Sequence, residues 1–165
     1  MFFDKIKVPN FIYALQMAYA NLSTRIVCVS DTHSNSKFNL PNGDILIHAG
    51  DLTRKGGYDE LKEVLSWLQS LKNFRLKIII AGNHDVTLDK TYYETHWRRY
   101  HPKKEDSEKI INMFNDPELR KKYGIIYLQD QTFIDPITQL KFYGRFVLLQ
   151  KNNENKYFSI QSMAA

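Results

Sequence analysis

The chain has 165 residues, of which 43% are hydrophobic and 25% charged, and this composition excludes a disordered or fibrous protein. Its 23 Lys and Arg residues against 18 Asp and Glu give a formal charge of +5, which favours partners that carry phosphate without identifying one. The single cysteine, Cys28, excludes an intramolecular disulfide, and no apolar stretch reaches the roughly 18 residues that a membrane-spanning helix needs.

Residues 1–24 are expected to form an N-terminal helical extension, with a short helix that begins at about Asn10. Residues 11–17 are largely apolar, as in a secretory signal, but Pro9 and Gln16 weaken the apolar character of this end of the chain. We therefore expect a cytoplasmic protein with no membrane partner, and secretion is the alternative.

Three short runs rich in β-branched residues predict buried strands at residues 25–30, 44–49 and 76–81. Between the second and third runs, Leu and Val recur at helical spacing over residues 58–71. The sequence therefore predicts a β-α-β unit with parallel strands and a right-handed crossover. The linker at residues 32–43 is rich in Ser and Asn, which is typical of a loop.

The second half of the chain is more polar. Residues 91–123 are charged and aromatic, and they predict surface structure with one amphipathic helix over Ser107–Phe114, capped by Ser107. Short strands are expected at residues 125–128, 132–134 and 140–143, with hairpin-like pairing that continues the sheet.

Polar side chains follow each of the three predicted parallel strands. Because the carboxyl ends of such strands meet at one edge of a sheet, where α/β proteins bind ligands, we expect these side chains to converge. Carboxylate, imidazole and amide oxygen together suit Mn²⁺, Fe²⁺ or Zn²⁺. Each residue alone is better explained as a cap or turn residue or, for the histidines, as a hydrogen-bonded loop histidine, but three such coincidences favour a metal site. The residues are Asp31, His33, Asp51, Asn83, His84 and Asp85.

These motifs, Asp31-x-His33, Gly50-Asp51 and Gly82-Asn83-His84-Asp85, resemble the calcineurin-like metallophosphoesterase family. The flanking residues resemble its metallophosphoesterase-domain-containing branch, which includes phosphodiesterases active on cyclic nucleotides. The resemblance implies an α/β fold in which a β-sandwich is flanked by helices, with two divalent ions (Mn, Fe or Zn) at the strand ends. It also implies that a metal-bound hydroxide attacks phosphorus in line.

The resemblance assigns a role to each motif residue. Asp31 and His33 bind the first ion, Asp51 bridges both ions, and Asn83 binds the second. His84, oriented by Asp85, assists the leaving group. Arg54 lies near the predicted site and is a candidate contact for the substrate phosphate, although a turn into the following helix explains the nearby glycines equally well.

The family pattern is incomplete after the third motif. Family members carry a further strand-end histidine and a G-H-x-H motif, and neither His96 nor His101 matches them. We therefore expect the second ion to bind more weakly than the first. The resemblance is expected to end near Gly144, which gives a truncated metallophosphoesterase domain at residues 25–144 and a divergent tail at 145–165. We hypothesise that the chain is a shortened product, from alternative splicing, a frameshift or an imperfect gene model.

The sequence thus predicts a metal-dependent hydrolase of phosphomonoesters or phosphodiesters, cyclic nucleotides among them. The alternative is a catalytically impaired remnant that binds metal or a partner and self-associates through an exposed sheet edge. Residues 96–104 are basic with interleaved aromatic side chains, and we interpret them as a solvated surface rather than a nucleic-acid site. His48, within the second predicted strand, is expected to be a core histidine.

Overall fold

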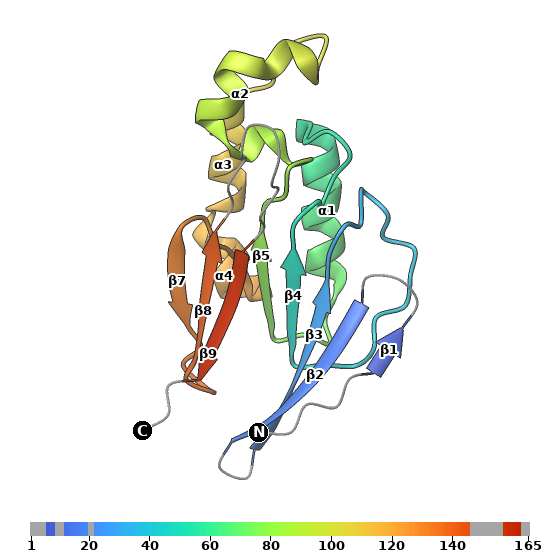
Figure 1. Ribbon diagram of the computed structural model, residues 1–165, viewed down its shortest axis with the longest axis vertical. Coiled ribbons are helices and arrows are strands. Elements are labelled where there is room, and N and C mark those ends of the chain that lie inside the picture. Colours follow the sequence, from blue (N-terminus) through green and yellow to red (C-terminus); the bar gives the residue numbers. More distant parts are fainter. Residues whose placement is uncertain (1–5, 9–11, 20–21, 146–156, 163–165) are drawn as a thin grey trace.

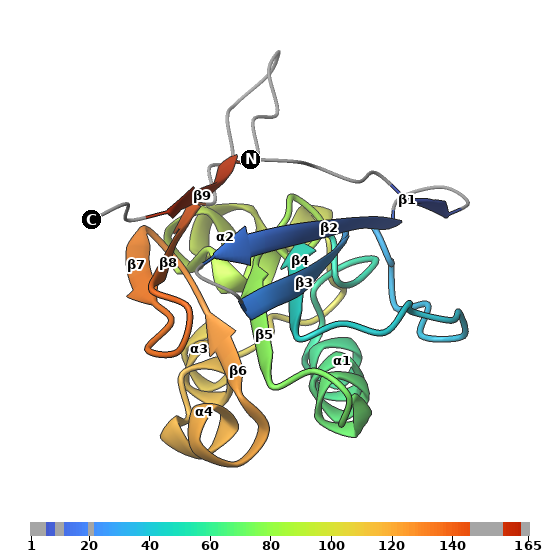
Figure 2. The same cartoon turned by 90° about the horizontal axis from the view of Figure 1, so that it is seen from below.

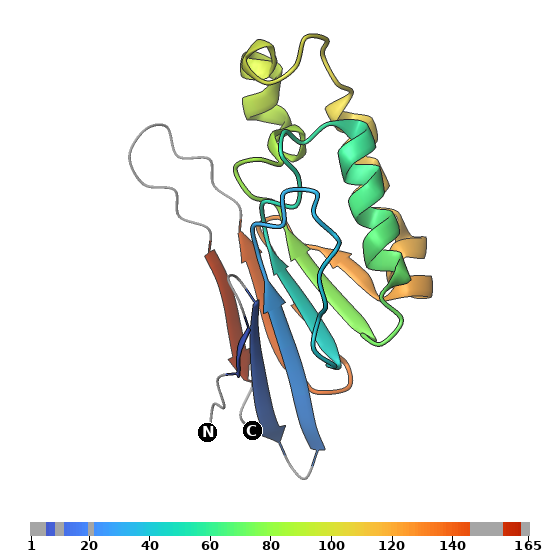
Figure 3. The same ribbon diagram turned by 90° about the vertical axis from the view of Figure 1, so that its right-hand side faces the viewer.

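The fold has three layers: a large sheet, a smaller sheet on one of its faces, and helices on the other. The computed structural model describes residues 6–8, 12–19, 22–145 and 157–162, with side chains for residues 24–145. Figure 1 shows the element order. The layers separate clearly in Figure 3, where strand β9 (Tyr157–Ser162) and helix α1 (Tyr58–Ser70) lie on opposite sides of the large sheet. This is the predicted α/β fold, a β-sandwich flanked by helices.

The large sheet has six strands in the order β1-β2-β3-β4-β5-β6. Neighbours from β3 to β6 are parallel, whereas β1 and β2 are antiparallel additions at one edge. All five residues of β5 are buried, as expected of a strand covered on both faces. The bounds are β1 Ile6–Val8, β2 Ile12–Tyr19, β3 Leu22–Val29, β4 Ile45–Ala49, β5 Leu76–Ile80 and β6 Ile125–Tyr127.

Helices α1 (Tyr58–Ser70), α3 (Ser107–Phe114) and α4 (Pro117–Tyr123) cover the face of the large sheet opposite the small sheet, as the view from below shows (Figure 2). Helix α1, Tyr58–Ser70, forms the predicted crossover between β4 and β5, and its buried Leu and Val residues face the sheet.

Helix α3, Ser107–Phe114, has the predicted bounds, but the expected cap is wrong. Asp106, not Ser107, is the cap: Asp106 has the extended backbone of a cap residue, and its carboxylate accepts from the Lys109 amide at 3.0 Å. Ser107 is already the first helical residue.

Several shorter helices connect the predicted elements. The 3-10 turn η1 (Val86–Leu88) follows β5, and α2 (Lys90–His96) and the 3-10 turn η2 (Trp97–Arg99) come next along the chain. Helix α4 (Pro117–Tyr123) leads into β6. No helix among the described residues combines the length and the apolar character needed to cross a membrane.

The small sheet contains β7 (Gln131–Ile134), β8 (Leu140–Arg145) and β9 (Tyr157–Ser162), all antiparallel. The buried Phe133 and Phe142 pack with Ile78 and Ile80 of the large sheet in one apolar cluster. The expected hairpin-like continuation of one sheet is therefore wrong. β6 joins the large sheet parallel to β5, and β7 and β8 form a hairpin in a separate sheet.

The helix expected within residues 1–24 is also wrong. Residues Ile12–Tyr19 form β2, which pairs with β3 over eight positions from Ile12↔Val29 to Tyr19↔Leu22. This pairing satisfies backbone groups that β3 would otherwise present at an open sheet edge, and such a non-local gain overrides local helix propensity. Within the expected tail, residues 157–162 form β9, whereas residues 146–156 and 163–165 lie outside the described part of the chain.

Candidate metal centre

The loops that leave β3 and β4 run side by side. The amide of Asp31 donates to the Gly50 carbonyl at 3.0 Å, that of His33 to the Asp51 carbonyl at 3.0 Å, and that of Ser34 to the Leu52 carbonyl at 2.8 Å. These bonds continue the parallel pairing of β3 with β4 beyond the ends of the strands. The first and second motifs therefore lie next to each other.

The same loops hold several residues in the left-handed backbone region. Asp31, His33, Ser34 and Asp51 have φ values of 56°, 45°, 63° and 53°. This conformation costs an L-residue about 1 to 2 kcal/mol, and such residues gather at functional sites. The concentration of four in two short loops is therefore a mark of function independent of the sequence motifs.

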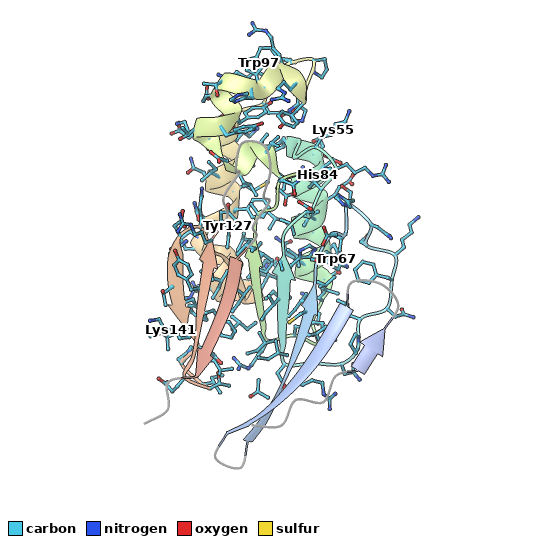
Figure 4. The ribbon with its side chains drawn as sticks, viewed as in Figure 1. Lys55, Trp67, His84, Trp97, Tyr127 and Lys141 are labelled. Carbon is cyan, nitrogen blue, oxygen red and sulfur yellow. The ribbon has the colours of Figure 1, made fainter. Side chains whose placement is uncertain are left out.

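Three of the motif side chains converge in the structure. The ligand atoms of His33, Asp51 and His84 all lie within 4.8 Å of one another. The two imidazole rings meet edge to face with their centroids 4.6 Å apart. Asp51 is buried, and its Oδ1 accepts from the His84 amide at 3.1 Å. In Figure 4 the labelled His84 lies above the upper ends of β4 and β5.

Backbone carbonyl groups fix the neutral tautomer of both rings. Nδ1 of His33 lies 3.1 Å from the Thr53 carbonyl oxygen, and Nδ1 of His84 lies 2.8 Å from the Arg54 carbonyl oxygen. Because a carbonyl oxygen only accepts, each Nδ1 carries the hydrogen and each neutral ring keeps its lone pair on Nε2. This is the arrangement found in histidines that ligate metals.

The donor set fits a divalent ion. Two imidazole nitrogens and a buried carboxylate suit Zn²⁺, Mn²⁺ or Fe²⁺. The structure brings His33 and Asp51 together, as expected from their places at the strand ends, and adds His84, for which the sequence predicts proton donation. Asp31 lies outside this triad, and Asn83 is half-buried between Gly82 and His84. The ligand roles of Asp31 and Asn83 stay predictions.

Gly82 makes room for the carboxylate of Asp51. A Cβ atom built on Gly82 would lie less than 3.0 Å from both Asp51 Oδ1 and the Asp51 amide nitrogen. Real non-bonded atoms do not approach so closely, so a side chain at this position displaces Asp51. The glycine of the third motif thus positions the carboxylate of the second.

Asp85 has a different role from the expected one. Its fully buried carboxylate accepts from the amides of Leu52, Thr53 and Gly82 and from the Thr53 hydroxyl, at 2.7 to 3.0 Å. Burial raises the pKa of Asp85 to about 6, although these hydrogen bonds favour the charged form. Asp85 therefore ties the second motif to the third, and the Arg54 carbonyl orients the His84 ring in its place.

Sequence reasoning missed Glu60, which lies beside the site. Glu60, in the first turn of α1, accepts hydrogen bonds from Ser34 and from the loop that precedes the helix. A glutamate three residues after a helix cap is a recognisable signal, since it is the second half of a capping box.

Two residues singled out in the sequence lie near the site. His48 is fully buried and its Nε2 lies 2.9 Å from the Thr32 hydroxyl, so it is the expected core histidine. Arg54 is exposed and donates from Nε to the His33 carbonyl at 3.3 Å, which places it beside the triad.

Comparisons with known proteins identify relatives of this chain. The protein-family model described as calcineurin-like phosphoesterase matches residues 24–160. The match therefore runs past Gly144, where the resemblance is expected to end. Metallophosphoesterase domain-containing protein 1 of Homo sapiens is 51% identical over 70 residues, which are 42% of this chain and 21% of that protein.

Two further relatives match longer segments. Probable rhamnogalacturonate lyase C of Emericella nidulans is 53% identical over 94 residues, 54% of this chain and 9% of that protein. A UPF0046 protein of Caenorhabditis elegans is 32% identical over 127 residues, 73% of this chain and 40% of that protein. The chain therefore matches between 9% and 40% of the length of these curated relatives.

Proposed function

Because the chain belongs to the calcineurin-like phosphoesterase family, we propose that it hydrolyses phosphomonoesters or phosphodiesters, cyclic nucleotides among them, with the help of a divalent metal. The observation that carries this proposal is the convergence of His33, Asp51 and His84, whose ligand atoms lie within 4.8 Å of one another. The carboxylate is buried and both rings present Nε2, so the three side chains form a ligand set rather than a chance surface group.

A divalent ion bound by these residues supplies Lewis-acid chemistry at the phosphoryl group and lowers the pKa of bound water. The residues themselves hold the site in place. Asp51 contributes the negative charge, and the carbonyl groups behind His33 and His84 keep the two rings from turning. Asp31 is a further ligand in this proposal, and Asn83 with Asp51 holds a second, weaker ion.

The exposed guanidinium of Arg54 completes the proposed site. Its Nε is occupied by the His33 carbonyl, which leaves the two terminal nitrogens to donate to non-bridging phosphate oxygens. His84 either ligates the ion or, in its protonated form, donates a proton to the leaving oxygen. A single Nε2 atom does not perform both roles in one step, so metal affinity and leaving-group dependence in a His84 variant separate them.

The test is hydrolysis of p-nitrophenyl phosphate and bis-p-nitrophenyl phosphate with Mn²⁺ and with excess EDTA. We expect activity with Mn²⁺ only, and its loss in Asp51→Asn, because the amide removes the charge at the centre of the ligand set. Asp59→Asn is the matched control, since Asp59 is an exposed carboxylate on α1. Hydrolysis that withstands EDTA, or that persists in Asp51→Asn, contradicts the proposal.

A specific observation also supports the alternative of a metal-binding protein without hydrolysis that associates with itself. Ile134 and Ile137 are the large apolar side chains that the described residues expose, at 43% and 66%. Both lie in or beside β7, a strand at the edge of the small sheet. Sedimentation of the wild type and of Ile134→Lys tests this candidate, because only an association through β7 is weakened by the charge.

A further inference from the structure

The two histidines of the triad are held by consecutive carbonyl groups of one short segment. His33 Nδ1 donates to the carbonyl of Thr53 and His84 Nδ1 to that of Arg54. The position of this segment therefore sets the direction of both Nε2 lone pairs. A shift of the segment would turn two of the three candidate ligands at once.

Two carboxylates fix that segment from opposite ends. The buried Asp85 accepts from the amide of Thr53 at 2.8 Å and from its hydroxyl at 2.7 Å. Glu60 binds the next two amides of the segment: its Oε1 accepts from the Arg54 amide at 3.3 Å and its Oε2 from the Lys55 amide at 3.1 Å. The carbonyl groups that hold the rings lie between these two anchors.

Glu60 also reaches the loop of the first motif. Its Oε1 accepts from the Ser34 hydroxyl at 3.1 Å, and Ser34 directly follows His33. The carboxylate thus contacts both segments that carry or hold the His33 ring. The backbone of Glu60 is anchored, because the next residue of α1, Leu61, is fully buried in the core against the sheet.

Ordinary helix capping does not account for this pattern. A glutamate at the third helical position commonly accepts from the cap amide, and Glu60 does accept from the amide of Gly57. That contact, at 3.4 Å, is the longest of its four hydrogen bonds. The other three go to Ser34, Arg54 and Lys55, which lie outside the helix.

We propose that Glu60 is a positioning residue that holds the Thr53–Arg54 segment, and through it fixes His33 and His84 with the hydrogen on Nδ1 and Nε2 directed at a divalent ion. The inference rests on the proposed metal-dependent function, since it gives the two rings their purpose. Glu60 contacts neither the ion nor the substrate, and its effect passes through the carbonyl groups of Thr53 and Arg54.

The experiment compares wild type, Glu60→Ala, Glu60→Gln and the control Asp59→Ala. Asp59 is the matched control because it is an exposed carboxylate in the same first turn of α1, and its loss removes the same charge. Nitrogen-15 NMR of the imidazoles in metal-free protein reports which ring nitrogen carries the hydrogen. Calorimetric titration with Mn²⁺ reports affinity, and a thermal melt establishes that each variant is folded.

In Glu60→Ala we expect His33 and His84 to become mixtures of the two neutral tautomers and the Mn²⁺ affinity to fall by about 10- to 100-fold, the usual effect of losing an outer-shell partner. Glu60→Gln is expected to be intermediate, because one of its terminal atoms still accepts. Asp59→Ala is expected to match the wild type in both measurements.

A Glu60→Ala variant that melts cooperatively and keeps wild-type tautomers and Mn²⁺ affinity overturns the proposal. Should Glu60→Ala not melt cooperatively, Glu60→Gln decides by the same two measurements. A wild type that binds Mn²⁺ without hydrolysing either ester overturns the proposed function, while tautomers and affinity still decide the role of Glu60. A wild type that binds no Mn²⁺ overturns both.

Discussion

Arg75 and Asp135 join the two sheets through a bidentate ion pair, with Nη1–Oδ1 at 2.9 Å and Nη2–Oδ2 at 2.6 Å. Arg75 directly precedes β5 of the large sheet, and Asp135 begins the turn between β7 and β8 of the small one. Asp135 also accepts from the amides of Ile137 and Thr138, so the carboxylate shapes the turn that it anchors. The small sheet is thus fastened at a point away from the candidate site.

Asp135→Asn is therefore expected to destabilise the fold without changing the site. The amide keeps one acceptor but loses the charge, and a hydrogen bond to a charged group contributes about 1.5 to 3 kcal/mol. Urea denaturation measures the loss, and an unchanged Mn²⁺ affinity at low temperature shows that the site is intact. Equal stability of variant and wild type would mean that the apolar contacts of Phe133 and Phe142 alone hold the sheets together.

Acid should remove the same contribution. Burial raises the pKa of Asp135, but the hydrogen bonds from Arg75 and Thr138 and the charge of Arg75 lower it by more. The pKa of Asp135 therefore lies below its ordinary value. A carboxyl whose folded pKa is depressed stabilises fully above its unfolded value, about 3.9, and loses that contribution as the pH falls through the folded value. The stability difference between wild type and Asp135→Asn should accordingly shrink from about pH 5 to about pH 2. A difference that stays constant over this range contradicts the assignment.

Gly82→Ala should abolish metal binding by displacing Asp51. A methyl group at this position would lie less than 3.0 Å from Asp51 Oδ1 and from the Asp51 amide nitrogen, so the second motif moves away from the third. Gly57→Ala is the matched control, because the nearest atom to its added carbon is 3.7 Å away. Calorimetry with Mn²⁺ should show lost or strongly reduced affinity in Gly82→Ala and near-normal affinity in Gly57→Ala. Tight binding by Gly82→Ala would place the ion away from Asp51.

Strands β3 to β8 and helix α1 follow from the sequence because their signals are local. Each buried run and each turn of the helix is read from neighbouring residues, and the parallel strand order then brings His33, Asp51 and His84 to one sheet edge. β2 could not be found in this way, because it is a strand through its pairing with β3.

The tautomers of the two histidine rings also depend on contacts between residues far apart in the sequence. Their tautomers depend on where the carbonyl groups of Thr53 and Arg54 point, and that direction depends on Glu60 and Asp85. None of the three metal motifs contains Glu60. Asp85 lies in the third motif, but its carboxylate binds backbone amides and the Thr53 hydroxyl instead of the His84 ring. The motifs therefore predict which side chains converge, whereas the contacts behind them decide how each presents its ligand atom.

His84→Asn separates the two roles open to His84. Its Nδ1 is committed to the Arg54 carbonyl, so Nε2 is the ring atom left to ligate an ion or to donate a proton. If His84 ligates the ion, the variant binds Mn²⁺ at least about tenfold more weakly, because an amide oxygen is a poorer ligand than imidazole for such ions.

If His84 donates a proton, Mn²⁺ affinity stays near that of the wild type, and hydrolysis slows most for esters with a poor leaving group. The slowing is then about 10²- to 10⁴-fold for an alkyl phosphate ester and much less for a p-nitrophenyl ester, which leaves without protonation. Calorimetry and the two substrates together distinguish the roles. A variant that keeps both wild-type affinity and wild-type rates with both esters would exclude His84 from the site and leave His33 and Asp51 to act with other ligands.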